Sequence, residues 1–138
     1  MNERQAFLRI LDANYNRAKE ALRVSEDVAR FLMKDPVLSS GFKRARHALT
    51  QTLLKLPVSY SKLLESRDSL RDVGRNSGIR DRKKAGWKDV MAANLKRAQE
   101  ALRVLEEISK ILAPRSTRFF EKIRFDLYDL EKRTVRKF

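Results

Sequence analysis

Two acidic residues stand four positions apart in a stretch that also contains arginines and a glycine. Asp68 and Asp72 belong to the sequence SRDSLRDVG, in which Arg67 precedes them and Gly74 follows. A pair of carboxylates could hold a hydrated Mg²⁺, while arginine side chains and backbone N–H groups hold phosphates. These residue types indicate a site for a metal-bound phosphate compound. A charged, exposed connecting loop would have a similar sequence, so that interpretation also stays open.

A duplicated segment is the second chemical signal in the chain. Residues 13–26 read ANYNRAKEALRVSE and residues 93–106 read ANLKRAQEALRVLE, with ten of the fourteen positions identical. Solvated helix surfaces tolerate many polar residues, so polar identity indicates a chemical constraint. A recent duplication would also explain it, but the sequence outside the two segments has diverged. The retained polar pairs are Asn14 and Asn94, Arg17 and Arg97, Glu20 and Glu100, Arg23 and Arg103, and Glu26 and Glu106.

The two asparagines have the same place in the two copies. On a helical wheel with about 100° per residue, Asn14 lies in the middle of the apolar side of its helix, and Asn94 lies likewise. We therefore expect both amides to be buried. A buried amide needs hydrogen-bond partners, which could be backbone groups within the bundle or a bound substrate.

The charged pairs surround this apolar side. Arg17 and Arg97 flank it, so their guanidinium groups could reach outward to solvent or inward to a cleft. Glu20 lies further round the helix, and Arg23 points away from the apolar side. The simplest interpretation of Glu20, Arg23 and Glu26 is solvated charge, with Arg23 and Glu26 as an exposed ion pair of little energetic value.

The elements that must position these residues are helices. Apolar residues recur at three- and four-residue steps through Leu11, Ala18, Leu22, Ser25, Val28 and Leu32. The prolines at 36, 57 and 114 separate the helical stretches. We predict helices over residues 3–34, 36–56, 58–65, 87–112 and 115–136, with a long basic loop over 67–88. No segment alternates with a period of two, so no sheet is expected.

The predicted fold class is all-α. Two duplicated αα-hairpins joined by a basic loop bury their apolar sides most simply as a four-helix bundle. We expect one domain over residues 1–138, with the first repeat at about 5–56, the connecting loop at about 57–86 and the second repeat at about 87–136.

The composition excludes several kinds of site and favours one class of ligand. The chain has 138 residues, a formal net charge of +14, no cysteine and one histidine, His47. Disulfides, thiolate metal sites and histidine-rich metal sites are excluded. The charge favours an anionic ligand. Nucleic acid is the weakest candidate, because basic residues are spread along the chain and the few aromatic residues fall at apolar-face positions such as Phe31, Phe42, Phe120 and Tyr128. Without a membrane-length apolar run or a signal pattern, a cytoplasmic location is expected.

Four stretches together resemble one family. They are ILDANYNRAKEALRVSEDVARF, KRARH, SRDSLRDVG and ANLKRAQEALRVLEE, and they cover the chain from about Arg9 to Tyr128. This combination resembles the helical domain at the N-terminus of some bacterial thiamine-phosphate synthases. Because the synthase barrel is not in this sequence, the resemblance implies the stand-alone form or an excised domain. It further implies an ATP- and Mg²⁺-dependent kinase that converts hydroxymethylpyrimidine monophosphate to the diphosphate.

The resemblance also carries site residues, because the family's patterned positions match residues of this chain. From the chemistry of these residues we expect Asp68 and Asp72 to be catalytic and metal-binding carboxylates and Arg67 to be a catalytic cation. The expected substrate-binding residues are Asn14, Arg17, Glu20, Arg46, His47, Gly74, Asn94 and Arg97. Asp12 also matches the pattern, but the second copy has Ala92 at this place, so the two repeats are not chemically equivalent.

Two other functions remain open. The chain could be a non-catalytic helical module that supports or regulates thiamine-phosphate synthase, or a basic nucleic-acid-binding protein. A homo-oligomer is compatible with each of these functions. A membrane partner is not expected.

Overall fold

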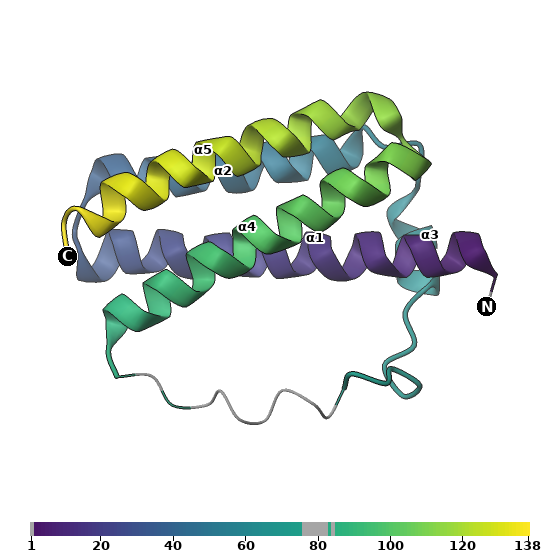
Figure 1. Ribbon diagram of the computed structural model, residues 1–138, viewed down its shortest axis with the longest axis horizontal. Coiled ribbons are helices and arrows are strands. Elements are labelled where there is room, and N and C mark those ends of the chain that lie inside the picture. The colour runs from purple at the N-terminus through teal and green to yellow at the C-terminus, as the bar shows by residue number, and fades with distance from the viewer. Residues whose placement is uncertain (1, 76–82, 84) are drawn as a thin grey trace.

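The computed structural model describes residues 2–75, 83 and 85–138, and all its regular elements are helical. Figure 1 shows the long helices and the connection that joins the two hairpins. The elements are α1 (Glu3–Asp27), a π-helical turn (Val28–Leu32), α2 (Pro36–Leu54), α3 (Tyr60–Glu65), α4 (Trp87–Leu112), a 3₁₀ turn (Pro114–Ser116) and α5 (Thr117–Val135).

Four long helices form the bundle. α1 packs against α2 and α4, and α5 packs against the same two helices. The layer of α2 and α5 lies above the layer of α1 and α4 in Figure 1, and residues 67–75, which follow α3, lie below the second layer. The prediction of an all-α bundle is confirmed, and no strand occurs in the residues that the structure describes.

The two repeats occupy equivalent places in this architecture. α1 and α4 run in opposite directions and pack against each other, and each also packs against the second helix of its own hairpin. Matching alanines, Ala18 and Ala98, are completely buried, as are Leu22 and Leu102. The small alanine side chains allow α1 and α4 to approach closely, and the leucines fill the core beside them.

The end of the first helix differs from the prediction. The α-helix stops at Asp27 and continues as a π-helical turn, in which the backbone N–H of Met33 bonds to the carbonyl of Val28. Lys34 then has a φ of 53°, which reverses the chain before α2. A π turn holds more residues than an α turn, so later side chains rotate round the axis. Leu32 was expected on the buried side and is 56% exposed.

The wheel placement of Asn14 needs a correction. The buried side of α1 includes Leu8, Tyr15 and Leu22, so its centre lies about 70° round the wheel from Asn14. Asn14 is therefore buried at the edge of the apolar side, not in its middle. Asn94 at the matching edge of α4 is only partly buried.

Two aromatic residues are also placed differently from the prediction. Phe42 and Phe120 are completely buried, as the apolar pattern predicts. Phe31 is 61% exposed, because it belongs to the π-helical turn, and Tyr128 is 39% exposed. Tyr128 packs at the surface edge-to-face with Phe125 and accepts a hydrogen bond from Arg124.

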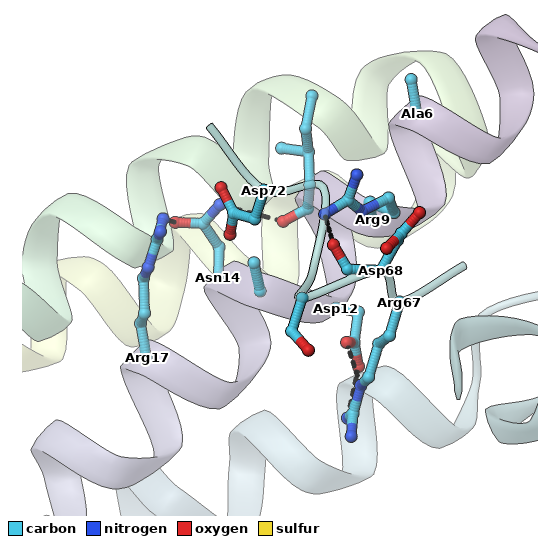
Figure 2. Close-up of a pocket in the computed structure, with 11 residues that line it drawn as sticks. Ala6, Arg9, Asp12, Asn14, Arg17, Arg67, Asp68 and Asp72 are labelled. Atoms are coloured by element: carbon cyan, nitrogen blue, oxygen red, sulfur yellow. Dashed lines mark hydrogen bonds and ion pairs between the residues drawn. The ribbon is translucent and has the colours of Figure 1, made fainter. Parts of the chain in front are cut away.

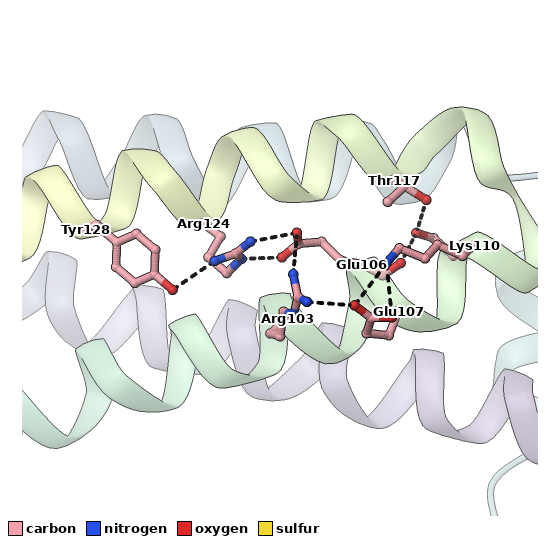
Figure 3. Close-up of polar contacts among 8 residues, drawn as sticks. Arg103, Glu106, Glu107, Lys110, Thr117, Arg124 and Tyr128 are labelled. Carbon is pink, nitrogen blue, oxygen red and sulfur yellow. Dashed lines mark hydrogen bonds and ion pairs between the residues drawn. The ribbon is translucent and has the colours of Figure 1, made fainter.

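The interpretation of Glu26 as a solvated charge is wrong. Glu26 is buried against α2, where Arg46 donates to it from Nε at 2.9 Å. The second repeat contains the matching pair: Glu106 is 1% exposed and accepts from Nε and Nη2 of Arg124 (Figure 3). On the wheel, this glutamate position faces the second helix of its hairpin. The retained glutamates thus have a structural role, because each of them joins the two helices of its hairpin.

No described helix combines the length and the apolar character that crossing a lipid bilayer requires. This finding covers residues 2–75, 83 and 85–138.

Candidate functional site

A cavity of about 470 Å³ lies between α1 and residues 67–75, which follow α3 and are called the connecting segment below. Figure 2 shows that this segment crosses over α1 and carries acidic side chains toward it. Because α1 is a rigid bundle helix, one wall of the cavity is fixed by the core. The lining residues are Ala6, Arg9, Ile10, Asp12, Ala13, Asn14, Arg17, Arg67, Asp68, Ser69 and Asp72.

The α1 wall presents an amide beside an arginine. Asn14 Nδ2 donates to the carbonyl of Ile10 at 2.9 Å, which leaves its side-chain oxygen directed toward Arg17. Arg17 Nη1 donates to this oxygen at 3.4 Å, and Arg17 is otherwise exposed. The buried amide therefore orients an arginine at the edge of the cavity.

The opposite wall is attached to α1 by an ion pair. Arg67 donates to the Asp12 carboxylate from Nε at 2.6 Å and from Nη2 at 2.9 Å. The Asp12 side chain is 6% exposed, and Asn16 also donates to its Oδ1. The Asp12 carboxylate raises the pKa of Arg67 above its usual value, so this guanidinium stays charged.

The two loop carboxylates are held by turns of their own segment. Asp68 Oδ1 accepts from the backbone N–H of Arg71 at 3.2 Å, and Asp72 Oδ1 accepts from that of Gly74 at 2.9 Å. Arg9 Nη2 donates to the backbone carbonyl of Asp68 at 3.2 Å. Asp68 and Asp72 therefore line the same cavity as Arg9, close to the α1 wall (Figure 2).

The structure brings together five of the residues that the sequence analysis named as site candidates. These are Asn14, Arg17, Arg67, Asp68 and Asp72. They come from α1 and from the connecting segment, which lie about fifty residues apart in the sequence. The other candidates do not line this cavity.

The remaining candidates are dispersed. Glu20 is exposed on α1, Arg46 is paired with Glu26, and His47 is exposed on α2. Gly74 supports Asp72 through its backbone N–H but does not line the cavity.

The second-repeat candidates lie on α4. Asn94 Nδ2 donates to the carbonyl of Val90 at 2.8 Å, which repeats the bond that Asn14 makes on α1. Arg97 is exposed. Neither residue lines the cavity beside α1.

Sequence reasoning missed Arg9 as a site residue and gave Asp12 no role. Arg9 is half-buried at the cavity, yet nothing in its own segment distinguishes it from the other arginines. For Asp12 a signal existed: its place in the second repeat is taken by Ala92, so the first repeat carries a carboxylate that the second lacks.

Asp68 and Asp72 supply only part of the ligand set that a Mg²⁺ ion needs. Within the described residues, no group of three or more histidine, aspartate or glutamate side chains could enclose a metal. Mg²⁺ is commonly bound through one or two carboxylates together with phosphate oxygens and water. Asp68 and Asp72 match these one or two carboxylates, and a bound phosphate compound with water would supply the other ligands.

Comparisons with known proteins place the chain in a family. The family model described as the ThiD2 family matches residues 9–133. The chain is 38% identical over 129 residues to a thiamine-phosphate synthase of Rhodopirellula baltica, covering 91% of this chain and 33% of that protein. It is 36% identical over 128 residues to a thiamine-phosphate synthase of Nostoc punctiforme, covering 92% of this chain and 35% of that protein.

The chain thus spans about one third of the length of these curated relatives. No solved structure matches it. Because the family match covers nearly all of the sequence, it includes both repeats and the segment that lines the cavity. The chain therefore belongs to the ThiD2 family.

Proposed function

We propose that this protein acts in thiamine biosynthesis as a kinase, transferring the γ-phosphoryl group of ATP to the phosphate of hydroxymethylpyrimidine monophosphate. The products are the pyrimidine diphosphate and ADP. The relatives named as thiamine-phosphate synthases support the biosynthetic context. The observation that carries the reaction type is the cavity, in which arginines of α1 face carboxylates of the connecting segment.

The charges in the cavity favour a metal-bound polyphosphate over a simple anion. Asp12 and Arg67 neutralise each other as an ion pair. The remaining charged groups of the lining are two arginines, Arg9 and Arg17, and the two carboxylates of Asp68 and Asp72. Asp68 also lies 3.6 Å from Nε of Arg71, which is 88% exposed, so this pair is weak. A bare polyphosphate would be repelled by these carboxylates, whereas a divalent cation between them and the phosphates turns repulsion into attraction.

The chain's own groups bind and align the substrates. Arg9 and Arg17 are the cations available to phosphate oxygens, because Arg67 already donates twice to Asp12. Guanidinium groups contact phosphate in a planar, two-pronged manner. Asp68 and Asp72 would hold Mg²⁺ or its water, which supplies charge neutralisation on the donor phosphates. The reaction consists mainly of positioning and charge stabilisation.

The acceptor reduces the need for a general base. An oxygen of the acceptor phosphate forms a bond to the γ-phosphorus while the bond from this phosphorus to the ADP oxygen breaks. A phosphate monoester has a second pKa of about 6, so its attacking oxygen already lacks a proton near neutral pH. This agrees with the position of His47, the single histidine, on the exposed side of α2 and outside the cavity lining.

The decisive experiment is a direct assay of the purified protein. ATP, Mg²⁺ and hydroxymethylpyrimidine monophosphate are supplied, and the diphosphate is measured by chromatography. We expect diphosphate formation by the wild type. Asp72→Asn keeps the shape of the side chain but removes its charge, so turnover should fall at least about tenfold, which corresponds to about 1.4 kcal/mol of transition-state stabilisation.

A matched control comes from α5. Asp126→Asn makes the same change at an exposed carboxylate that pairs with Lys122 and lies outside the cavity, and it should leave turnover unchanged. Both variants should keep the thermal stability of the wild type. Wild-type turnover in both Asp68→Asn and Asp72→Asn would contradict the assignment of these carboxylates, and absence of any diphosphate product would contradict the kinase.

A second candidate follows from the length of the relatives. The chain matches only about one third of each synthase, so a non-catalytic helical module that supports a synthase is the alternative. It predicts no diphosphate from the isolated protein and a change in synthase rate when the two are mixed.

A further inference from the structure

In the described part of the chain, three buried carboxylates accept hydrogen bonds from arginines, and one of these pairs differs from the others. Glu26 with Arg46 and Glu106 with Arg124 each join the two helices of a hairpin. Asp12 with Arg67 instead joins bundle helix α1 to the segment that carries Asp68 and Asp72. The Asp12–Arg67 pair therefore attaches the connecting segment to the bundle and does not join two helices of the bundle.

The attachment lies directly before the acidic segment. α3 is anchored by Leu63, which is 1% exposed, and by Ser66, which is 5% exposed. Arg67 is the next residue, and Asp68 follows it. Residues 69–75 are all exposed, with Leu70 85% and Val73 103% exposed. Apolar burial thus ends at Ser66, and polar contacts must hold the segment on α1.

Only the first repeat possesses this carboxylate. The second repeat has Ala92 at the place of Asp12, although it retains the neighbouring Asn94 and Arg97. The matching asparagines even make the same bond to the carbonyl four residues earlier. The position that holds Arg67 is therefore one at which the repeats differ although the neighbouring Asn and Arg are retained.

We propose that Asp12 is a positioning residue, which by holding the Arg67 guanidinium fixes the connecting segment so that Asp68 and Asp72 face Arg9 and Arg17 across the cavity. This inference rests on the proposed kinase function for its effect on turnover, but not for its effect on the segment. It also assigns Arg67 to positioning: a guanidinium that gives Nε and Nη2 to Asp12 contributes little net charge to the cavity.

A double-mutant cycle tests whether Asp12 acts through Arg67. Asp12→Asn and Arg67→Gln should each lower kcat at least about tenfold, with a smaller change in the KM for ATP, since this pair leaves the phosphate contacts to Arg9 and Arg17. The double variant should be no slower than the slower single variant, because both changes break the same pair. Asp12→Glu, which restores the charge, should recover part of the rate.

Glu106→Gln serves as the matched control. It also removes the charge of a buried carboxylate paired with an arginine, but it lies between α4 and α5 and outside the cavity. It should lower the thermal stability and leave kcat unchanged at temperatures where the protein remains folded. If Glu106→Gln lowered kcat as much as Asp12→Asn does, the effect of Asp12→Asn would be explained by general destabilisation of the protein.

Millisecond hydrogen exchange supplies a readout independent of activity. The backbone N–H groups of Arg71 and Gly74 are bonded to the Asp68 and Asp72 carboxylates. In Asp12→Asn these two amides should exchange at least about fivefold faster, while amides in α1 and α4 remain unchanged. Without that acceleration, or with additive effects on kcat, the positioning role is refuted. Faster exchange together with an inactive wild type would refute the kinase alone.

Discussion

Glu26 and Glu106 are buried carboxylates whose arginine partners reach across to them from the second helix of each hairpin. The Glu106 carboxylate raises the pKa of Arg124, and burial only partly opposes it. An arginine left at a largely buried position without its carboxylate is costly. At the scale of single residues, these pairs are therefore the polar contacts whose loss should be most damaging to stability.

We predict that Glu106→Gln lowers the free energy of unfolding by about 2–3 kcal/mol, measured by urea denaturation at neutral pH. The neighbouring Glu107→Gln is its control. Glu107 is 47% exposed and pairs with the exposed Arg103 and Lys110, so its substitution should change the stability much less than Glu106→Gln does. Equal effects of the two substitutions would mean that burial of the Glu106 pair has no energetic consequence.

At the scale of elements, the start of α2 depends on one capping residue. Asp35 accepts from the backbone N–H groups of Val37 and Leu38, both at 3.0 Å, and Pro36 occupies the first helical position. These contacts, the Leu38 N–H first and the ion pair with Lys137 next, hold the pKa of Asp35 below its usual 3.8. The cap also follows the turn at Lys34, so it fixes where the second helix of the hairpin begins.

We predict that Asp35→Ala destabilises the protein by about 1 kcal/mol, whereas Asp35→Asn, which can still cap, costs less. The direction in which this stabilisation changes with pH follows from the lowered pKa of Asp35. The charged form is the one that the folded state favours, so its stabilisation is fully present above the unfolded pKa of about 3.9. It is lost as the pH falls through the lower folded pKa. Thermal melts at pH 7 and pH 2.5 should show a smaller difference between wild type and Asp35→Asn at pH 2.5.

At the scale of the whole molecule, an internal duplication carries one candidate site. The helices of the two repeats are equivalent in packing, and the glutamate–arginine pairs repeat with them. Among the described residues, the cavity is lined by α1 and by residues 67–72, so the second repeat contributes no residue to it. Ala92 further lacks the group that would hold such a segment.

We therefore predict that the protein binds one nucleotide per chain. Isothermal titration of a non-hydrolysable ATP analogue with Mg²⁺ should give a stoichiometry of about one, and Asp68→Asn should weaken this binding. Two equivalent sites per chain would instead indicate that the α4 face around Arg97 binds a nucleotide as the α1 face does.

The sequence by itself determined the helices and their pairing. Apolar periodicity, prolines between helices and the duplicated segment predicted the all-α bundle, and the bounds of α4 agree with the prediction. These features are local, since they depend on residues three or four positions apart. The same local signals predicted that the polar repeat positions carry a constraint, and this holds for Glu26 and Glu106, although the constraint there is structural.

Only the tertiary structure decided which polar residues meet. The helical wheel led to Glu26 being interpreted as a solvated charge, because a wheel of α1 cannot show that Arg46 reaches this carboxylate from α2. It likewise cannot show that Arg67 binds Asp12 or that Arg9 joins the cavity, because these contacts link residues 55 and 59 positions apart in the sequence. The physical reason is that the partner of a buried charge is set by how helices and the connecting segment pack, and periodicity within one helix carries no information about its neighbour.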